Sequence, residues 1–312
     1  MKRFHYRQFD DIGALCDLKS QRGRTISVVI PTLNEAATVG AIVATVRECL
    51  VERFPLVDEI FVIDSGSVDD TRMLAQEAGA VVCLAEEIAP EHGHVAGKGE
   101  NLWKSLFVTS GDICVFVDGD IQDFHEGFIV GLVGPLLEEE ELQYVKAFYR
   151  RPLHEGGRQL PQGGGRVSEI LIRPLFDMFY PALGEFEQPL AGEYAVRRNL
   201  LERLSFPCGY GVETSHLIDV FQHCGMEAFA QCDMECRQHR NRALADLGEM
   251  SREILQVFIA RAERDGMMDL SPRWRRQNAD FAASRSRGMV KKNSLELRER
   301  QPYHRLHHPP EA

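Results

Sequence analysis

The stretch Val115-Phe116-Val117-Asp118-Gly119-Asp120 limits the possible folds of this chain more than any other. An apolar run with β-branched residues predicts a buried strand, and this run ends abruptly in two carboxylates one residue apart. Such a strand directs carboxylate oxygens to one place beyond the edge of its sheet. Oxygens of this type are the ligands that Mg²⁺ and Mn²⁺ prefer. An isolated Asp-Gly-Asp is also a common turn sequence, so its interpretation depends on the rest of the chain.

The first half of the chain alternates between predicted strands and helices. Apolar runs predict strands at 26–30, 59–63, 80–83 and 112–117, and helical patterns predict helices at 35–50, 69–78 and 100–110. Near-continuous apolar strands that alternate with helices indicate an α/β fold, with a mainly parallel central sheet covered by helices on both faces. In such folds ligands bind beyond the carboxyl ends of the strands.

The second half is less regular. Apolar runs predict strands at 145–149 and 228–236, and helices are predicted at 168–179 and 245–264. A glycine-rich stretch, Gly163-Gly164-Gly165-Arg166, precedes the first of these helices. Converging backbone N–H groups, a helix N-terminus and a guanidinium group favour an anion site there. A flexible linker is the alternative.

Charge and composition exclude some classes of protein. The 312 residues carry a net charge of −11, although ten basic and only five acidic residues lie in 266–312. An acidic body argues against a nucleic-acid-binding surface. No apolar segment follows the N-terminal residues, and no run reaches the roughly 20 apolar residues of a membrane helix, so we expect no signal peptide and no membrane segment. Buried cysteines such as Cys83 and Cys114 are expected to be reduced, which suits a cytoplasmic protein.

Cys232, Cys236 and His239 offer half of a zinc site as an alternative. Their spacing is unusual for zinc and no second Cys/His pair follows, so ordinary buried thiols are the favoured interpretation.

Several motifs in a fixed order resemble one family. Pro31-Thr32-Leu33-Asn34-Glu35, Asp64-Ser65-Gly66-Ser67 and Asp118-Gly119-Asp120 resemble the nucleotide-sugar half of GT-A-fold glycosyltransferases. Further segments narrow the resemblance: 97–103, 148–153, 163–167, 188–194, 209–213 and 239–242. Together they resemble the glucosyl-3-phosphoglycerate synthase family, retaining glycosyltransferases of family 81, over residues 25–260.

The resemblance implies a reaction and a set of donor contacts. The reaction would move glucose from a nucleoside diphosphate, UDP-glucose being favoured, to the 2-hydroxyl of 3-phosphoglycerate. Mannose transfer from GDP-mannose to the same acceptor is the alternative. The implied donor-binding residues are Pro31, Thr32, Leu33, Glu35, Ser65, Lys98, Asp118, Gly119, Asp120, Gly192 and Glu213. Of these, Glu213, Asp120 and Lys98 would be catalytic. Many relatives have Ser where this chain has Gly119, so one hydroxyl contact is expected to be lost.

The resemblance also implies the metal and acceptor sites. Asp120 and His239 would hold a divalent metal, with Mg²⁺ favoured and Mn²⁺ possible. Without the resemblance, His239 with Arg237 and Arg240 would be interpreted as a surface basic patch. The implied acceptor-binding residues are Gly165, Arg166, Val167, Ser168 and Asn241. A homodimer is also implied.

The expected organisation has three parts. Residues 1–24 form an N-terminal extension, 25–265 form the GT-A domain and 266–312 form a basic, loosely docked tail that chemistry does not require. Within the domain, 25–122 would bind the nucleotide sugar and 123–265 the acceptor.

Two rival functions remain: a nucleotide-sugar-binding regulator, which intact catalytic positions disfavour, and a nucleotidyltransferase. The latter would need a Gly-rich, basic loop directly after the first strand, where Pro31-Thr32-Leu33-Asn34-Glu35 stands instead.

Overall fold

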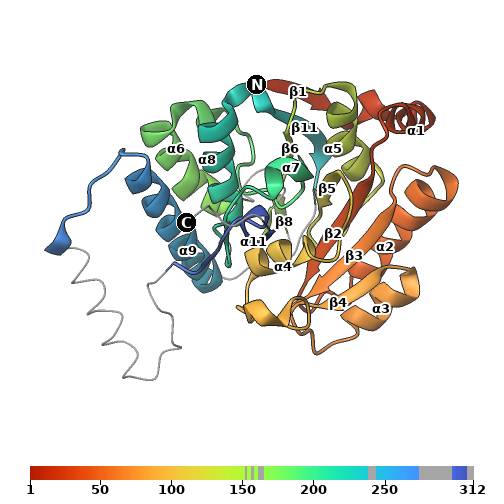
Figure 1. The fold of residues 1–312 in the computed structure, drawn as a ribbon, viewed down its shortest axis with the longest axis horizontal. Coiled ribbons are helices and arrows are strands. Elements are labelled where there is room, and N and C mark those ends of the chain that lie inside the picture. The colour runs from red at the N-terminus through yellow and green to blue at the C-terminus, as the bar shows by residue number, and fades with distance from the viewer. Residues whose placement is uncertain (152, 156–157, 161–164, 238–243, 274–296, 308–312) are drawn as a thin grey trace.

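A computed structural model describes residues 1–151, 153–155, 158–160, 165–237, 244–273 and 297–307. Its centre is an eight-stranded sheet with the order β1-β11-β6-β9-β5-β2-β3-β4 (Figure 1). The strands are β1 (Lys2–His5), β2 (Ile26–Thr32), β3 (Glu59–Asp64), β4 (Val81–Leu84), β5 (Ile113–Phe116), β6 (Tyr144–Arg150), β9 (Tyr194–Arg197) and β11 (Phe229–Cys236). All neighbours pair in parallel except β9, which is antiparallel to both β5 and β6.

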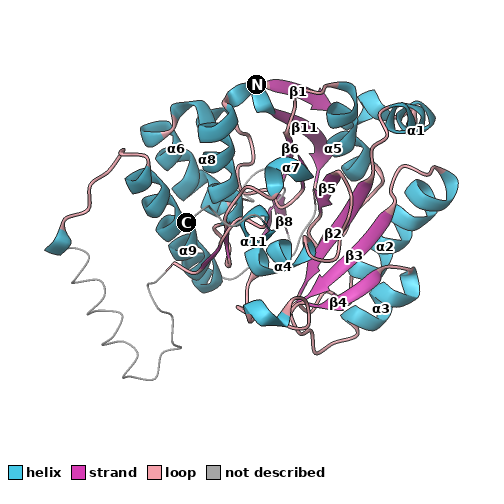
Figure 2. Cartoon of the chain, viewed as in Figure 1, coloured by secondary structure: helices cyan, strands magenta, loops and turns pink. Residues whose placement is uncertain are grey.

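Helices cover both faces of this sheet (Figure 2). Those described are α1 (Ile12–Gln21), α2 (Val39–Arg47), α3 (Thr71–Ala78), α4 (Lys98–Ser105), α5 (Gly127–Glu138), α6 (Arg173–Phe179), α7 (Arg198–Leu201), α8 (Val212–Cys224), α9 (Leu244–Arg264) and α11 (His304–His307). Two short antiparallel pairs lie outside the main sheet: β7 (Leu153–Glu155) with β8 (Arg158–Leu160), and β10 (Phe206–Pro207) with β12 (Glu299–Arg300).

Alternation along the strands divides the core into two layers. In β2, Val28 and Ile30 pack with α1, α2, α3 and α5, whereas Val29 faces the opposite layer with α4, α6, α8 and α9. Side chains of a strand point to opposite faces in turn, so a continuous apolar run is what a sheet covered on both sides requires. The predicted α/β, mainly parallel, GT-A-like fold is confirmed.

The helix α5 was not predicted from the sequence. It is apolar all round, and all its residues from Gly127 to Leu137 are buried. Because such a helix has no polar face, its sequence lacks the 3.6-residue alternation by which amphipathic helices are identified.

Both chain ends are more closely integrated than the sequence indicated. The expected N-terminal extension supplies the edge strand β1, which pairs with β11, and α1, which packs against α5. The expectation of a loosely docked tail is wrong for residues 297–307. There β12 pairs antiparallel with β10, and Trp103 donates a hydrogen bond to the carbonyl of Gln301 at 3.1 Å.

In the part of the chain that the structure describes, no helix is both long and apolar enough to cross a membrane. All eight cysteines have free thiols, and Cys114 and Cys232 are buried. The zinc alternative rests partly on His239, which lies outside the described residues.

Candidate active site

The carboxyl end of β5 carries the two carboxylates at the centre of the site. The strand ends at Phe116, and Asp118 and Asp120 follow beside the end of β2, its neighbour in the sheet. The hydroxyl of Thr38 donates to the carbonyl of Gly119 at 2.5 Å, which holds this turn against the start of α2. A Cβ atom at Gly119 would lie 3.1 Å from Cγ2 of Thr32. A serine here would therefore need Thr32 to shift slightly.

Lys98 joins Asp118 to the carboxylate of Glu213. Its ammonium nitrogen lies 2.6 Å from Oδ1 of Asp118 and 2.7 Å from Oε1 of Glu213. Lys98 opens α4 and Glu213 lies in the first turn of α8, so the pair links the N-termini of two helices. A Cβ atom at Gly192 would collide with the charged ends of both Asp118 and Lys98, so a larger residue there would displace this pair.

The glycines on either side of Lys98 permit a close backbone approach. A Cβ atom on Gly97 would collide with the carbonyl of Cys208, and one on Gly99 would collide with the carbonyl of Pro207. Gly97 also has a φ of 151°. The Gly-Lys-Gly sequence thus places α4 directly on the backbone of residues 207–209.

Arg237 is the second cation of the site and was missed as a site residue. Its guanidinium group lies 3.1 Å from Asp118 and 2.6 Å from Asp120, and on its other side 3.0 Å from Glu193. Tyr149 accepts a hydrogen bond from Arg237 at 2.9 Å and donates one to Glu193 at 2.6 Å. Arg237 is 1% exposed, so interpreting it as part of a surface basic patch is wrong.

These charges shift one another's pKa values. Burial would raise the pKa of Asp118, but Lys98 and Arg237 outweigh it and hold that pKa well below its usual range. For Glu193, which is fully buried, burial raises the pKa although Arg237 opposes it. Burial likewise lowers the pKa of Lys146, on β6, to about 8. The low pKa of Asp118 keeps one carboxylate ionised for cation binding across the physiological range.

The loops after β2 and β3 are bound to each other. The backbone N–H of Asn34 donates to Ser67 at 2.8 Å, and that of Glu35 donates to Thr71 at 2.8 Å. The side chain of Asn101, from α4, donates to Ser65 at 2.7 Å. Leu33 remains 53% exposed. The predicted donor residues therefore lie close together: Pro31 and Thr32 end β2, Leu33 and Glu35 follow in its loop, and Ser65 lies in the adjoining loop after β3.

The predicted acceptor residues are only partly described. Gly165 has a φ of 73°, which favours glycine, and its carbonyl accepts from the backbone N–H of Glu169 at 3.1 Å. Arg166 is half-buried, whereas Val167 and Ser168 are buried. Gly163, Gly164, Asn241 and the predicted metal ligand His239 lie outside the described residues.

The donor set fits a divalent metal. Asp118 and Asp120 already converge on a single cation, the guanidinium group of Arg237, and each side chain keeps about a quarter of its surface exposed. Among the ion pairs of the described residues, the four carboxylates of the site contact Lys98 and Arg237. No described group of three or more His, Cys, Asp or Glu side chains could hold a metal alone. Two carboxylates suit Mg²⁺ or Mn²⁺, which take further ligands from substrate phosphates.

Comparison with known proteins places this geometry among glycosyltransferases. The model of the family described as "Glycosyl transferase family 2" matches residues 27–202. The chain is 48% identical over 270 residues to glucosyl-3-phosphoglycerate synthase of Petrotoga mobilis, covering 86% of this chain and 83% of that protein. It is also 48% identical over 245 residues to the enzyme of that name from Mycobacterium tuberculosis, covering 78% and 75%.

Solved structures are similar over nearly the whole chain. The M. tuberculosis enzyme in complex with phosphoglyceric acid has a TM-score of 0.81 and 40% identity, covering 98% of this chain and 99% of that one. The same enzyme with Mn²⁺, UDP-glucose and phosphoglyceric acid has a TM-score of 0.79 and 41% identity, covering 95% of each. Its complex with Mg²⁺ and UDP has a TM-score of 0.75 and 45% identity, covering 83% and 86%.

Proposed function

We propose a specific reaction for this chain, which belongs to glycosyl transferase family 2 by its family model and to the glucosyl-3-phosphoglycerate synthases by its relatives. The chain is a glycosyltransferase. It transfers glucose from UDP-glucose to the 2-hydroxyl of 3-phosphoglycerate, with retention of the anomeric configuration. The observation that carries the proposal is the meeting of Asp118, Asp120, Lys98 and Glu213 at the carboxyl end of β5.

The donor would bind across the ends of β2, β3 and β5. The two adjoining loops that contain Leu33 and Ser65 would hold the uridine, and Lys98 would contact the diphosphate or the sugar. Asp120 and His239 would hold the metal, for which we favour Mg²⁺ over Mn²⁺; relatives have been solved with each ion. When bound, the metal would neutralise charge on the departing diphosphate.

The acceptor would bind at the start of the helical stretch that begins near residue 166. Gly165, Arg166, Val167, Ser168 and Asn241 are its proposed contacts. Arg166 would bind the phosphate through a two-pronged, charge-assisted contact, and the positive end of the helix would add to this attraction. A phosphate held there would fix which hydroxyl of the glycerate faces the sugar.

Retention is best explained by attack from the face that the diphosphate leaves. A double displacement would need a carboxylate free to reach the sugar C1. Glu193 is instead buried against Arg237 and Tyr149, and Glu213 is held by Lys98. We therefore propose that the bond from C1 to the diphosphate breaks as the 2-hydroxyl bonds to C1, and that the acceptor proton passes to a diphosphate oxygen. Glu213 would orient the sugar and stabilise positive charge that develops on it.

Mannose transfer from GDP-mannose remains the second candidate, because epimers differ at a few hydrogen bonds only. The names of the relatives favour glucose. The deciding experiment incubates the protein with 3-phosphoglycerate and each of a panel of UDP- and GDP-sugars, with Mg²⁺ or with EDTA, and identifies products by mass spectrometry. We expect a hexosyl-phosphoglycerate from UDP-glucose only, and only with metal. A product from GDP-mannose alone would replace the proposal by its alternative.

A further inference from the structure

Residues 297–307, here called the docked segment, contact α4 directly and reach α8 through Arg261 of α9, and these two helices supply the Lys98–Glu213 pair. Lys98 belongs to α4 and Glu213 to α8, and their charged atoms lie 2.7 Å apart. The geometry of this pair therefore depends on how two separate helices are held relative to each other. Two adjacent residues of the docked segment, Glu299 and Arg300, bind these two helices in different ways.

Arg300 holds α4. Its Nε and Nη2 atoms each lie 2.7 Å from an oxygen of Glu100, which is fully buried and two residues beyond Lys98. The guanidinium group also donates to the carbonyl of His92 at 2.7 Å and lies 4.9 Å from the ring centre of Trp103. A planar fork that binds both oxygens of a carboxylate fixes direction as well as distance.

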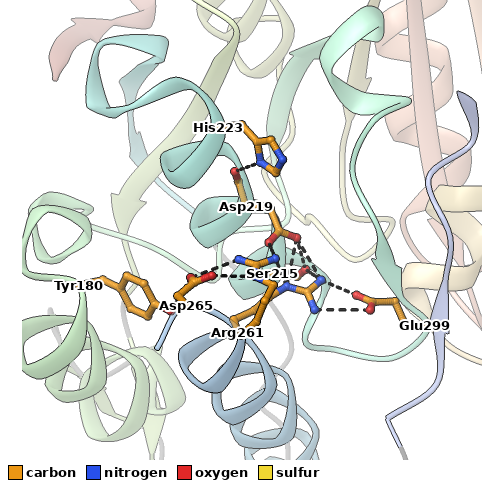
Figure 3. Close-up of polar contacts among 8 residues, drawn as sticks. Tyr180, Ser215, Asp219, His223, Arg261, Asp265 and Glu299 are labelled. Atoms are coloured by element: carbon orange, nitrogen blue, oxygen red, sulfur yellow. Dashed lines mark hydrogen bonds and ion pairs between the residues drawn. The ribbon is translucent and has the colours of Figure 1, made fainter. Parts of the chain in front are cut away.

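Glu299 reaches α8 through Arg261 of α9. Figure 3 shows Arg261 between Glu299 and the α8 residues Asp219 and Ser215. Its Nε lies 3.0 Å from Asp219, and its Nη2 lies 2.6 Å from Ser215. Arg261 and Asp219 are 5% and 3% exposed, so their contact is shielded from water, whereas Glu299 lies at the exposed end of the network. Ser215 lies two residues beyond Glu213 on the same helix.

The backbone between the two helices is held from both sides. On one side, β12 pairs with β10, and the N–H of Cys208 donates to the carbonyl of Arg298 at 2.9 Å. On the other side, the N–H groups of Gly99 and Glu100 donate to the carbonyls of Gly209 and Cys208 at 3.3 and 3.0 Å. This connection then enters α8 at Val212.

We propose that the docked segment positions Lys98 and Glu213 for the transfer reaction, with Arg300 and Glu299 as the positioning residues. The inference rests on the proposed function, because it concerns the same site. Arg300 acts through Glu100 on the first turn of α4. Glu299 acts through Arg261 on the N-terminal half of α8.

The test compares Arg300→Ala with Arg305→Ala in the full chain. Arg305 is an exposed arginine of the same segment and serves as the matched control. We expect Arg300→Ala to lower kcat and kcat/KM together by about 10- to 100-fold, because a misplacement of about 1 Å at a reacting centre costs up to about 100-fold. Arg300→Lys should recover part of the loss, since it keeps the charge but not the fork. Arg305→Ala should match the wild type.

Hydrogen exchange provides a readout that does not depend on transfer. The amides of Gly99 and Glu100 should exchange faster in Arg300→Ala than in the wild type or Arg305→Ala, with circular dichroism confirming that each variant is folded. A folded Arg300→Ala with wild-type kcat and unchanged exchange would overturn the inference. If Arg300→Ala does not fold, Arg300→Lys and Glu299→Gln test the inference in its place. A wild-type kcat in both variants would refute the positioning role of the docked segment. A wild type without transfer would instead refute the proposed function, and the exchange data would still test positioning.

Discussion

Replacing Arg237 by Ala removes the cation that three carboxylates of the site share. Glu193 is fully buried and loses a contact of 3.0 Å, although Tyr149 still donates to it at 2.6 Å. Breaking a buried ion pair by removing one partner costs about 3–5 kcal/mol. Asp118 keeps its contact with Lys98, and both Asp118 and Asp120 are partly exposed. Water therefore reduces their contribution to the loss of stability. We expect a loss near the lower limit, about 3 kcal/mol in the free energy of unfolding, due mainly to Glu193.

A divalent metal should compensate this variant in part. Arg237 and a metal would compete for Asp118 and Asp120, so Mn²⁺ should stabilise Arg237→Ala more than it stabilises the wild type, by up to about 1 kcal/mol at equal concentration. Urea unfolding at pH 7, with EDTA or with Mn²⁺ and UDP, measures both quantities. The control is Arg7→Ala, which removes an exposed ion pair with Glu235 that is worth about 0–1 kcal/mol. A loss in Arg237→Ala no larger than in this control, or equal gains from Mn²⁺, would refute the reasoning.

The same variant should also respond to pH in a defined direction. The pKa of Glu193 is raised above its ordinary 4.5 by burial, and Arg237 opposes that rise. Without Arg237 the pKa should rise further. A carboxyl group whose folded pKa is raised binds its proton more tightly in the native state, so stability falls as pH rises from about 4.5 toward the folded pKa. Arg237→Ala should show this fall over a wider pH range than the wild type.

Three further predictions concern the metal, the acceptor and a buried histidine. EDTA should abolish transfer, and Mg²⁺ or Mn²⁺ should restore it. Asp120→Ala should lose orders of magnitude in rate, because a metal clamp is worth several kcal/mol. Full activity in that variant would show that Asp120 does not bind the metal. Arg166→Ala should cost about 2–4 kcal/mol in kcat/KM for 3-phosphoglycerate and leave UDP binding, measured by calorimetry, unchanged. Weaker UDP binding with an unchanged kcat/KM for 3-phosphoglycerate would instead place Arg166 in the donor site. His216 is fully buried, and burial lowers its pKa from 6.5 to about 3, so its neutral form is favoured in the native state and stability should fall as pH falls from 6.5 toward 3. Urea unfolding at pH 6.5 and 5 should show that His216→Gln removes about 1.1 kcal/mol per pH unit of this loss, and an unchanged slope would contradict the assignment.

The strands β2, β3, β4 and β5 could be predicted because each is mainly apolar and ends in polar or turn-forming residues. Val115 to Val117 followed by two aspartates is one example, and Glu59 to Ile63 followed by Asp64 is another. Neither β9 nor its direction was predicted, because a run of four residues gives little signal and a buried strand can be apolar whether its neighbours are parallel or antiparallel. Its direction depends on which elements lie beside it.

The residues of the candidate site also divide into those that a sequence motif indicated and those that only the tertiary structure reveals. Lys98 and Gly192 lie in sequence motifs, and the structure places both against Asp118. Arg237 looks from its neighbours in sequence like part of a surface patch. Its burial arises from β11 ending beside β6, which brings Tyr149 to it from a distant part of the chain. The docked segment gave no local signal either, because Glu299 and Arg300 are ordinary surface residue types until their partners Arg261 and Glu100 are placed.

The most direct test of the central claim is NMR spectroscopy of the product formed from UDP-glucose and 3-phosphoglycerate with Mg²⁺. UDP-glucose carries its sugar as the α-anomer, so a retaining transfer should give an α-glucosyl signal coupled to C2 of the glycerate, with the phosphate still on C3. A β-anomer would contradict retention and the front-face mechanism built on Lys98 and Glu213. Free glucose with unchanged 3-phosphoglycerate would contradict the transfer itself.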